Sequence, residues 1–154
     1  MTSDPDRPPQ DPRQGDPHRE GLHPEGPDPA GGAAPVVLLV EDDGLLLMEA
    51  ADTLAEAGFT VLEAPHADQA LRVLESRPDV EVLMTDVDMP LGSMNGFALA
   101  RLVSRRWPRI PVLVVSGMGS PGPHDMPPGA RFIPKPYAPS ALVRTLHDTV
   151  RRAA

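Results

Sequence analysis

From Val36 onward, short apolar runs alternate with amphipathic stretches, and this alternation is the strongest constraint that the sequence places on the fold. Short runs rich in apolar residues, each followed by a polar or turn residue, are typical of buried strands. We expect five such strands, at Val36–Val40, Phe59–Glu63, Val82–Thr85, Ile110–Val115 and Arg131–Ile133.

The stretches between these runs carry apolar residues at helical spacing. The first comprises Leu46, Leu47, Ala50, Leu54 and Ala57. Gly58 supplies the stop signal of this helix, because glycine commonly follows a helix C-terminus. Further helices are expected at Ala67–Ser76, at Gly96–Arg106 with Asn95 as its N-cap, and from about Pro139 to Arg151.

A strand followed by a helix, repeated along the chain, predicts a parallel sheet covered by helices on both faces. We therefore expect an α/β fold with a doubly wound, five-stranded parallel sheet of the flavodoxin-like type, in the order 2-1-3-4-5. The fourth helix is expected to be short or missing. Residues 117–129 hold four glycines and four prolines, and in a helix interior proline costs about 3 kcal/mol and glycine about 1 kcal/mol.

Residues 1–35 differ sharply in composition from the rest of the chain. They hold nine of the 21 prolines and five of the 13 glycines, and Leu22 is nearly their only large apolar side chain. Such a segment buries too little apolar surface to offset its ordering entropy, so we expect a disordered acidic tail. Residues 36–151 would form the folded domain, and residues 152–154 would end the chain without an output domain.

Composition excludes several classes of function. The chain has no cysteine, which rules out disulfides, thiolate metal sites and thiol nucleophiles. Its net charge of −8 argues against direct binding of nucleic acid, which needs clustered lysine and arginine. No stretch approaches the roughly 20 apolar residues of a membrane helix, so we expect no membrane insertion and a cytoplasmic location.

Polar side chains follow four of the predicted strands at the point where each strand ends. Glu41 and Asp42 follow the first strand, Asp86 the third, Ser116 the fourth and Lys135 the fifth. In the order 2-1-3-4-5 these ends lie side by side, about 4.8 Å apart per strand step. Lys135 is also the single lysine beside 13 arginines, and a compact ammonium suits a tight anion site better than a planar guanidinium does. We expect these five side chains to converge on one site.

The ordered set of motifs resembles the receiver domain of two-component response regulators, the CheY-like fold. The motifs are Leu39–Asp43, Thr85–Pro90, Ser116-Gly117 and Pro134–Pro136. The resemblance covers residues 36 to about 151. It implies a phosphoacceptor in a phosphorelay rather than an enzyme with a separate substrate.

The resemblance assigns the acidic residues to phosphoryl transfer. Asp86 would be the phosphoacceptor. Mg²⁺ would be held by Glu41, Asp42, Asp86 and the backbone carbonyl of Asp88, and a carboxylate-rich oxygen site suits this ion. From the residues alone, Asp42 and Asp43 could equally form a helix N-cap and an acidic first turn, and Asp43 fits that interpretation better than Asp42.

The resemblance assigns phosphate sensing to Ser116 and Lys135, which would contact the phosphoryl oxygens. Phe132 matches the family's switch aromatic, although an aromatic residue on a strand is often simply part of the core. Pro136 is a candidate for a cis peptide bond, which is rare outside X-Pro sequences. One departure from the family pattern lies after Asp86, where the loop is two residues longer than usual.

The implied partners are a sensor histidine kinase, a histidine phosphotransfer protein, or both, and a downstream protein that the sequence does not identify. Because no output module follows the last helix, we expect a stand-alone receiver that acts by protein contact. Two alternatives stay open. One is a degenerate receiver that binds partners without phosphate; the other is a phosphatase of the haloacid-dehalogenase type, suggested by the Asp86-Val87-Asp88 pair.

Overall fold

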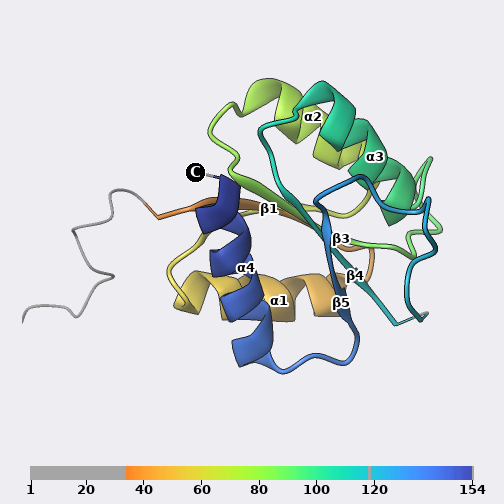
Figure 1. The fold of residues 1–154 in the computed structure, drawn as a ribbon. Helices are drawn as coiled ribbons and strands as arrows, with labels where there is room; N and C mark the ends of the chain where they lie inside the picture. The colour runs from red at the N-terminus through yellow and green to blue at the C-terminus, as the bar shows by residue number, and fades with distance from the viewer. Residues whose placement is uncertain (1–33, 118, 154) are drawn as a thin grey trace, which may run out of the picture.

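The computed structural model describes residues 34–117 and 119–153, which form a five-stranded parallel sheet with helices on both faces (Figure 1). The strand order is β2-β1-β3-β4-β5, as predicted. The expected disordered tail at 1–35 lies outside the described residues, apart from its last two. The elements are β1 (Val36–Val40), α1 (Gly44–Glu56), β2 (Thr60–Ala64), α2 (Ala67–Ser76), β3 (Val82–Asp86), α3 (Gly96–Arg106), β4 (Val112–Ser116), β5 (Arg131–Pro134) and α4 (Pro139–Ala153).

Two strands begin later than the sequence predicts, β2 by one residue and β4 by two, because a turn precedes each of them. The Phe59 amide donates to the Leu54 carbonyl at 3.0 Å, so Phe59 closes α1 and β2 starts at Thr60. The Ile110 amide donates to the Trp107 carbonyl at 2.9 Å, so Ile110 is buried within the turn that precedes β4. The other boundaries agree with the prediction to within two residues.

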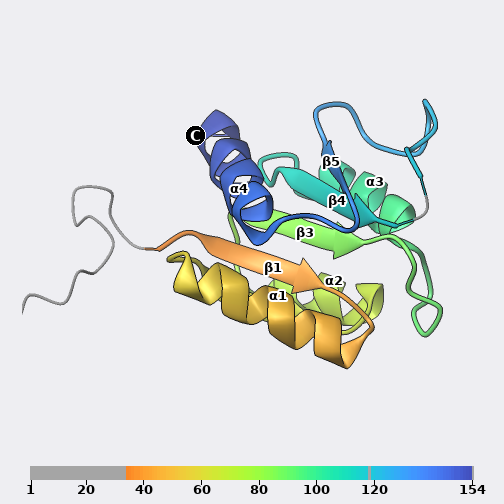
Figure 2. The same cartoon turned by 90° about the horizontal axis from the view of Figure 1, so that it is seen from below.

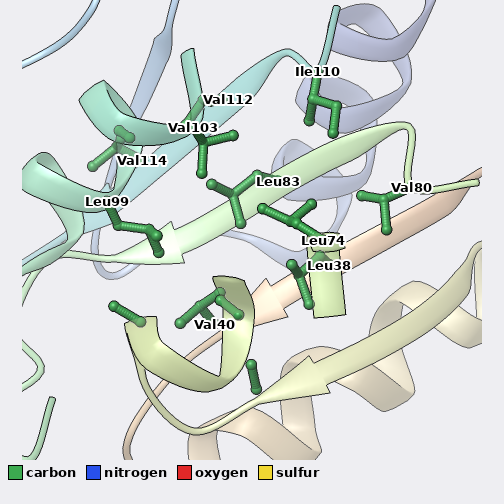
Figure 3. Close-up of a cluster of buried hydrophobic side chains, with 14 of the residues drawn as sticks. Leu38, Val40, Leu74, Val80, Leu83, Leu99, Val103, Ile110, Val112 and Val114 are labelled. Carbon is green, nitrogen blue, oxygen red and sulfur yellow. The ribbon is translucent and has the colours of Figure 1, made fainter. Parts of the chain in front are cut away.

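The sheet separates two apolar cores. On one face, α2 and α3 pack over the strands, as Figure 3 shows for Leu74, Leu99 and Val103 against Leu38 and Leu83. On the other face lie α1 and α4 (Figure 2). These helices bury Leu54, Leu142 and Leu146 against strand residues of opposite parity. Fully burying each such leucine contributes about 1.5–3 kcal/mol, so both layers hold the strands in register.

The helix ends follow the local sequence. The Asp43 carboxylate accepts hydrogen bonds from the Leu45 and Leu46 amides and caps α1, and the Asn95 side chain accepts one from the Ala98 amide and caps α3. Gly58 adopts a positive φ of 94° directly after α1, a conformation that glycine reaches without strain. These caps set where α1 and α3 begin, next to the carboxyl ends of β1 and β3.

The segment between β4 and β5 contains no helix among its described residues, 117 and 119–130. It packs as an irregular loop instead. The Arg101 side chain of α3 donates to the Asp125 carbonyl at 2.7 Å, and Met126 packs against the core on the α2 and α3 face. The glycines and prolines of this segment thus abolish the helix as predicted, while the loop still covers the sheet.

Candidate functional site

The carboxyl ends of β1, β3 and β5 bring Glu41, Asp86 and Lys135 together. The Lys135 ammonium lies 3.0 Å from Glu41 Oε2 and 3.4 Å from Asp86 Oδ1. Glu41 and Asp86 are both buried, whereas Lys135 is partly exposed. The structure therefore places one cation between two carboxylates at the centre of this edge of the sheet.

Glu41 is fixed by the end of the β1–β2 ladder. Its amide donates to the Ala64 carbonyl at 3.1 Å, which continues the parallel pairing one residue beyond β1. Its Oε1 atom accepts the Asp43 amide at 3.2 Å, and Oε2 accepts the Lys135 ammonium. With both carboxylate oxygens bonded, the side chain is held in one orientation.

Asp42 joins these carboxylates, and Asp43 does not. Glu41, Asp42 and Asp86 each offer one oxygen, and the three oxygens lie within 4.8 Å of one another. Asp43 is exposed and caps α1, in keeping with the helix-cap interpretation. The acidic run after β1 thus divides into two residues at the site and one at the helix start.

Burial raises the pKa of the Glu41 and Asp86 carboxyl groups, because a charged carboxylate is poorly solvated there. Lys135 lowers both pKa values, but burial outweighs it. For Lys135 itself, burial disfavours the charged ammonium, but the hydrogen bond to Glu41 and the charge of Asp86 more than compensate, so the lysine pKa is raised. The Lys135 ammonium therefore stays protonated, next to two carboxyl groups that are poorly solvated.

Ser116 ends β4 beside this cluster. Its side chain is almost completely buried, and its carbonyl accepts the Lys135 amide at 2.9 Å. A β-carbon added to the following Gly117 would lie 3.8 Å from the β-carbon of Lys135, which is ordinary contact. Serine and lysine are thus joined through the backbone across the ends of β4 and β5.

The other predicted site residues lie around this centre. Phe132 is half-buried on β5 and packs against the core on the α2 and α3 face. The peptide bond between Lys135 and Pro136 is cis, as the sequence suggested. The side chain of Asp88 is exposed, and its charge contributes to the raised pKa of Asp86.

Gly96 packs tightly beside the site, and the sequence indicated it only as the start of a helix. A β-carbon built there would lie 2.0 Å from the Asp86 carbonyl oxygen, far inside van der Waals contact. The Gly96 amide donates to the Val87 carbonyl at 2.9 Å, and the Thr85 hydroxyl donates to the Asp86 carbonyl at 2.8 Å. The first residue of α3 therefore packs directly against the backbone of Asp86.

The long loop after Asp86 is attached to the start of α2. The Ser93 hydroxyl donates to Asp68 Oδ1 at 2.6 Å, and its amide donates to Oδ2 at 3.3 Å. Gly92 lies against His66, the N-cap of α2. At the tip of the loop, Leu91 is 82% exposed. The length of this loop was predictable from the sequence, but its attachment to α2 was not.

A cavity of about 460 Å³ opens beside the carboxylates, between α1 and the segment that follows β5. Its floor includes Glu41, Asp86 and Lys135, and its walls include Leu46 and Tyr137. Burial raises the pKa of the Tyr137 phenol. Tyr137 was not among the predicted site residues, although it lies only two residues after Lys135.

The residues of the site fit a divalent cation such as Mg²⁺. All three clustered side chains offer carboxylate oxygens, the ligand type that Mg²⁺ prefers. Two of them are buried with raised pKa values, so a nearby cation would relieve their poor solvation and mutual repulsion. Glu41, Asp42 and Asp86 are the side chains that would hold it.

Comparison with known proteins identifies relatives of this chain. Residues 37–147 match the family model described as response regulator receiver domain. The chain is 32% identical over 120 residues to the sensor kinase CckA of Brucella abortus and 36% identical over 121 residues to the response regulator protein FleR of Pseudomonas aeruginosa. These alignments cover 75% and 77% of this chain but only 12% and 24% of the relatives, so it corresponds to a small part of each.

The fold also matches solved structures. A response regulator receiver protein from Sinorhizobium medicae superposes with a TM-score of 0.73 at 23% sequence identity, covering 79% of this chain and 98% of the other. Within the residues that the structure describes, no helix has the length and apolar character needed to cross a membrane.

Proposed function

The chain belongs to the response regulator receiver domain family, and on that premise we propose that it accepts a phosphoryl group on Asp86 from a phosphohistidine of a sensor kinase. An oxygen of the Asp86 carboxylate forms a bond to phosphorus while the phosphorus–nitrogen bond of the donor breaks. The products are an aspartyl phosphate and a free histidine side chain. Such transfers depend mainly on positioning and on stabilisation of charge.

The observation that carries the proposal is the placement of Lys135 between Glu41 and Asp86. Before transfer, the ammonium offsets part of the charge of both carboxylates. After transfer, the same ammonium would pair with phosphoryl oxygens, which carry nearly two negative charges. Glu41 keeps the lysine in place meanwhile, because its hydrogen bond to Lys135 does not involve Asp86.

Mg²⁺ held by Glu41, Asp42 and Asp86, with the Asp88 carbonyl as a further proposed ligand, would supply the positive charge that lets an anionic phosphodonor approach this acidic site. Among the protein's own groups, Gly96 and Thr85 fix the Asp86 backbone. Because Asp86 is buried, its carboxylate, the proposed nucleophile, has little contact with water. These residues therefore position the acceptor before the donor arrives.

The response to phosphorylation would begin at Ser116 and Phe132. The Ser116 hydroxyl would bind a phosphoryl oxygen, and Phe132 would change its packing as the loop after β4 moves toward the site. A phosphoryl group shifts such an equilibrium only through contacts that differ between the two states. The partners would be a sensor histidine kinase or a histidine phosphotransfer protein, and a downstream protein bound by contact in the cytoplasm.

The test is phosphorylation of the purified chain by acetyl phosphate and Mg²⁺, read by intact-protein mass spectrometry. We expect a mass increase of one phosphoryl group in the wild type and none in Asp86→Asn. Asp43→Asn is the matched control, because the Asp43 side chain lies outside the carboxylate cluster and caps α1, and asparagine caps a helix as well as aspartate does. This control should be phosphorylated like the wild type.

The same experiment separates the alternatives. A degenerate receiver would give no phosphoprotein with acetyl phosphate or with any kinase, which would contradict the proposal. A phosphatase of the haloacid-dehalogenase type would instead hydrolyse an added phosphoester with many turnovers. Phosphorylation that persists in Asp86→Asn would show that another residue is the acceptor.

A further inference from the structure

Charge is divided unequally between the two halves of the sheet. Residues 34–95, which build β1, β2, β3, α1 and α2, carry 13 acidic and two basic residues, a net charge of −11. Residues 96–154, which build α3, β4, β5 and α4, carry nine basic and two acidic residues, a net charge of +7. Strong local charge in a protein of opposite net charge points to a function in binding rather than in solubility.

Three of these basic residues line one cavity. It has a volume of about 340 Å³ and lies at the amino ends of β4 and β5, between the C-terminal ends of α3 and α4. Arg109, Arg131 and Arg152 contribute to its wall, and no acidic residue does. Because the strands are parallel, this edge of the sheet is opposite to the edge that holds Asp86 and Lys135.

Within the part of the chain that the structure describes, ion pairs do not neutralise the charges of the three arginines. Among the described residues, none of the three forms an ion pair with a carboxylate. Arg109 donates to the Pro78 carbonyl at 3.0 Å, which holds it in place without neutralising it. The nearby acid is Asp148, whose carboxylate accepts a hydrogen bond from Arg151. The fields of Arg131 and Arg152 reach Asp148 and help lower its pKa.

The rest of the wall comes mostly from apolar residues, several of them prolines, together with Ser104 and Thr149. Ile110 and Val112 form part of it, and Pro127 and Pro128 supply another part from the loop that precedes β5. Proline fixes the backbone φ angle, so this side is stiff, and the hydrogen bond from Arg101 to the Asp125 carbonyl anchors the same loop. The cavity thus combines cationic donors with a wall that is partly preformed by proline residues.

We propose that this cavity binds a small anion that carries a diphosphate or similar multiply charged phosphate group. Guanidinium groups match phosphate oxygens in bidentate geometry. Three of them in one cavity suit a ligand with more than one negative charge. The volume of about 340 Å³ lies at the lower end of ordinary ligand pockets, which favours a small molecule over a macromolecular segment.

Complementing the helix dipole does not account for the arrangement. Basic residues in the last turn of a helix are stabilised by the helix dipole, and this explains Arg152 near the end of α4. Arg109 follows α3 and Arg131 begins β5, so neither lies in the last turn of a helix. The hydrogen bond to the Pro78 carbonyl occupies part of the donor capacity of Arg109. The helix dipole explains neither its remaining donors nor Arg131, and an anionic ligand would engage both.

The test is titration of the full chain with inorganic diphosphate in Mg²⁺-free buffer, by calorimetry and by amide chemical shifts. We expect saturable binding with shifts at Val112, Gly129 and Arg131. The double variant R131Q/R152Q should weaken binding by about a hundredfold, on the order of tenfold for each charged hydrogen-bond donor lost. Glutamine removes the positive charge but keeps the first three side-chain carbons and a polar end, and a thermal melt of each variant checks that it is folded.

The double variant R72Q/R144Q is the matched control, since it removes the same charge outside the cavity. It should change the affinity by less than about twofold, because exposed charges at a distance are screened. Equal weakening in both double variants would overturn the proposal in favour of general charge attraction. Absence of binding, or shifts confined to Glu41, Asp86 and Lys135, would also overturn it. Shifts of residues 1–33 in R131Q/R152Q without diphosphate would identify the acidic N-terminal segment as the occupant instead.

Discussion

Lys135 Nζ lies between Glu41 and Asp86, 3.0 Å from the glutamate oxygen and 3.4 Å from the aspartate oxygen. The shorter contact is to the residue that is not the proposed acceptor. The lysine is therefore anchored independently of Asp86, and it can remain in place while Asp86 changes its bonding.

We predict that Lys135→Arg leaves the fold and Mg²⁺ binding largely intact but impairs the response to phosphorylation. A planar guanidinium cannot place one compact charge between Glu41 and Asp86. Amide chemical shifts of the Ser116 and Phe132 region, recorded with and without acetyl phosphate, measure the response. A variant that shows the same phosphorylation-dependent shifts as the wild type would refute a specific role for the lysine.

Gly96→Ala should destabilise the protein and disturb the acceptor. The new β-carbon would sit 2.0 Å from the Asp86 carbonyl oxygen, and relief of such overpacking costs about 1–3 kcal/mol. Gly44→Ala is the control, because a β-carbon there meets nothing within 4 Å and alanine favours helix by up to about 1 kcal/mol. In urea unfolding, Gly96→Ala should be less stable than the wild type, and Gly44→Ala should be as stable as the wild type or more stable. Phosphorylation should be slower only in Gly96→Ala.

Removal of Mg²⁺ should make stability depend on pH in a defined direction. The pKa values of Glu41 and Asp86 lie above their ordinary values of 4.5 and 3.8. The folded state therefore binds more protons than the unfolded state in this window, and metal-free stability falls as pH rises through the folded pKa values. Mg²⁺ favours the charged carboxylates, so the increase in melting temperature that it causes should grow from acidic to neutral pH.

Thermal melts with Mg²⁺ or with a chelator, between about pH 4.5 and 7.5, check this prediction over the range in which carboxyl groups of raised pKa titrate. Glu41→Gln serves as the comparison, because it removes one of the two raised carboxyl groups and should flatten the metal-free pH dependence. An Mg²⁺ effect that is independent of pH would contradict the assignment of these carboxylates as ligands.

Arg101→Gln should loosen the loop between β4 and β5. The Arg101 side chain donates to the Asp125 carbonyl at 2.7 Å in a partly buried position, and loss of such a charged hydrogen bond costs about 1.5–3 kcal/mol. Hydrogen exchange of residues 119–130 should become faster, while β1 and β3 stay protected. Arg105→Gln, an exposed change on the same helix, should leave the exchange of the loop unchanged.

Most of the fold was predictable because apolar periodicity and turn residues agree with each other along the chain. Where they conflicted, the prediction failed by one or two residues: Phe59 and Ile110 are as apolar as strand residues, but their amides bond to the preceding turns. The convergence of Glu41, Asp42, Asp86 and Lys135 follows from strand order, which the sequence indicated. The tight approach of Gly96 to Asp86 and the attachment of Ser93 to Asp68 join residues whose proximity depends on tertiary packing, which local pattern does not encode.

Among residues 34–153, the unequal division of charge across the sheet creates an electric dipole that runs from the β2 side toward the β5 side. A charged partner therefore exerts a torque on the protein before the two surfaces touch, and encounters begin in a preferred orientation. A basic partner would meet the α1 and α2 side first, and an acidic one the α3 and α4 side. This preferred orientation weakens as salt shortens the Debye length. The association rate would therefore depend on ionic strength, even for a partner whose contacts in the final complex do not.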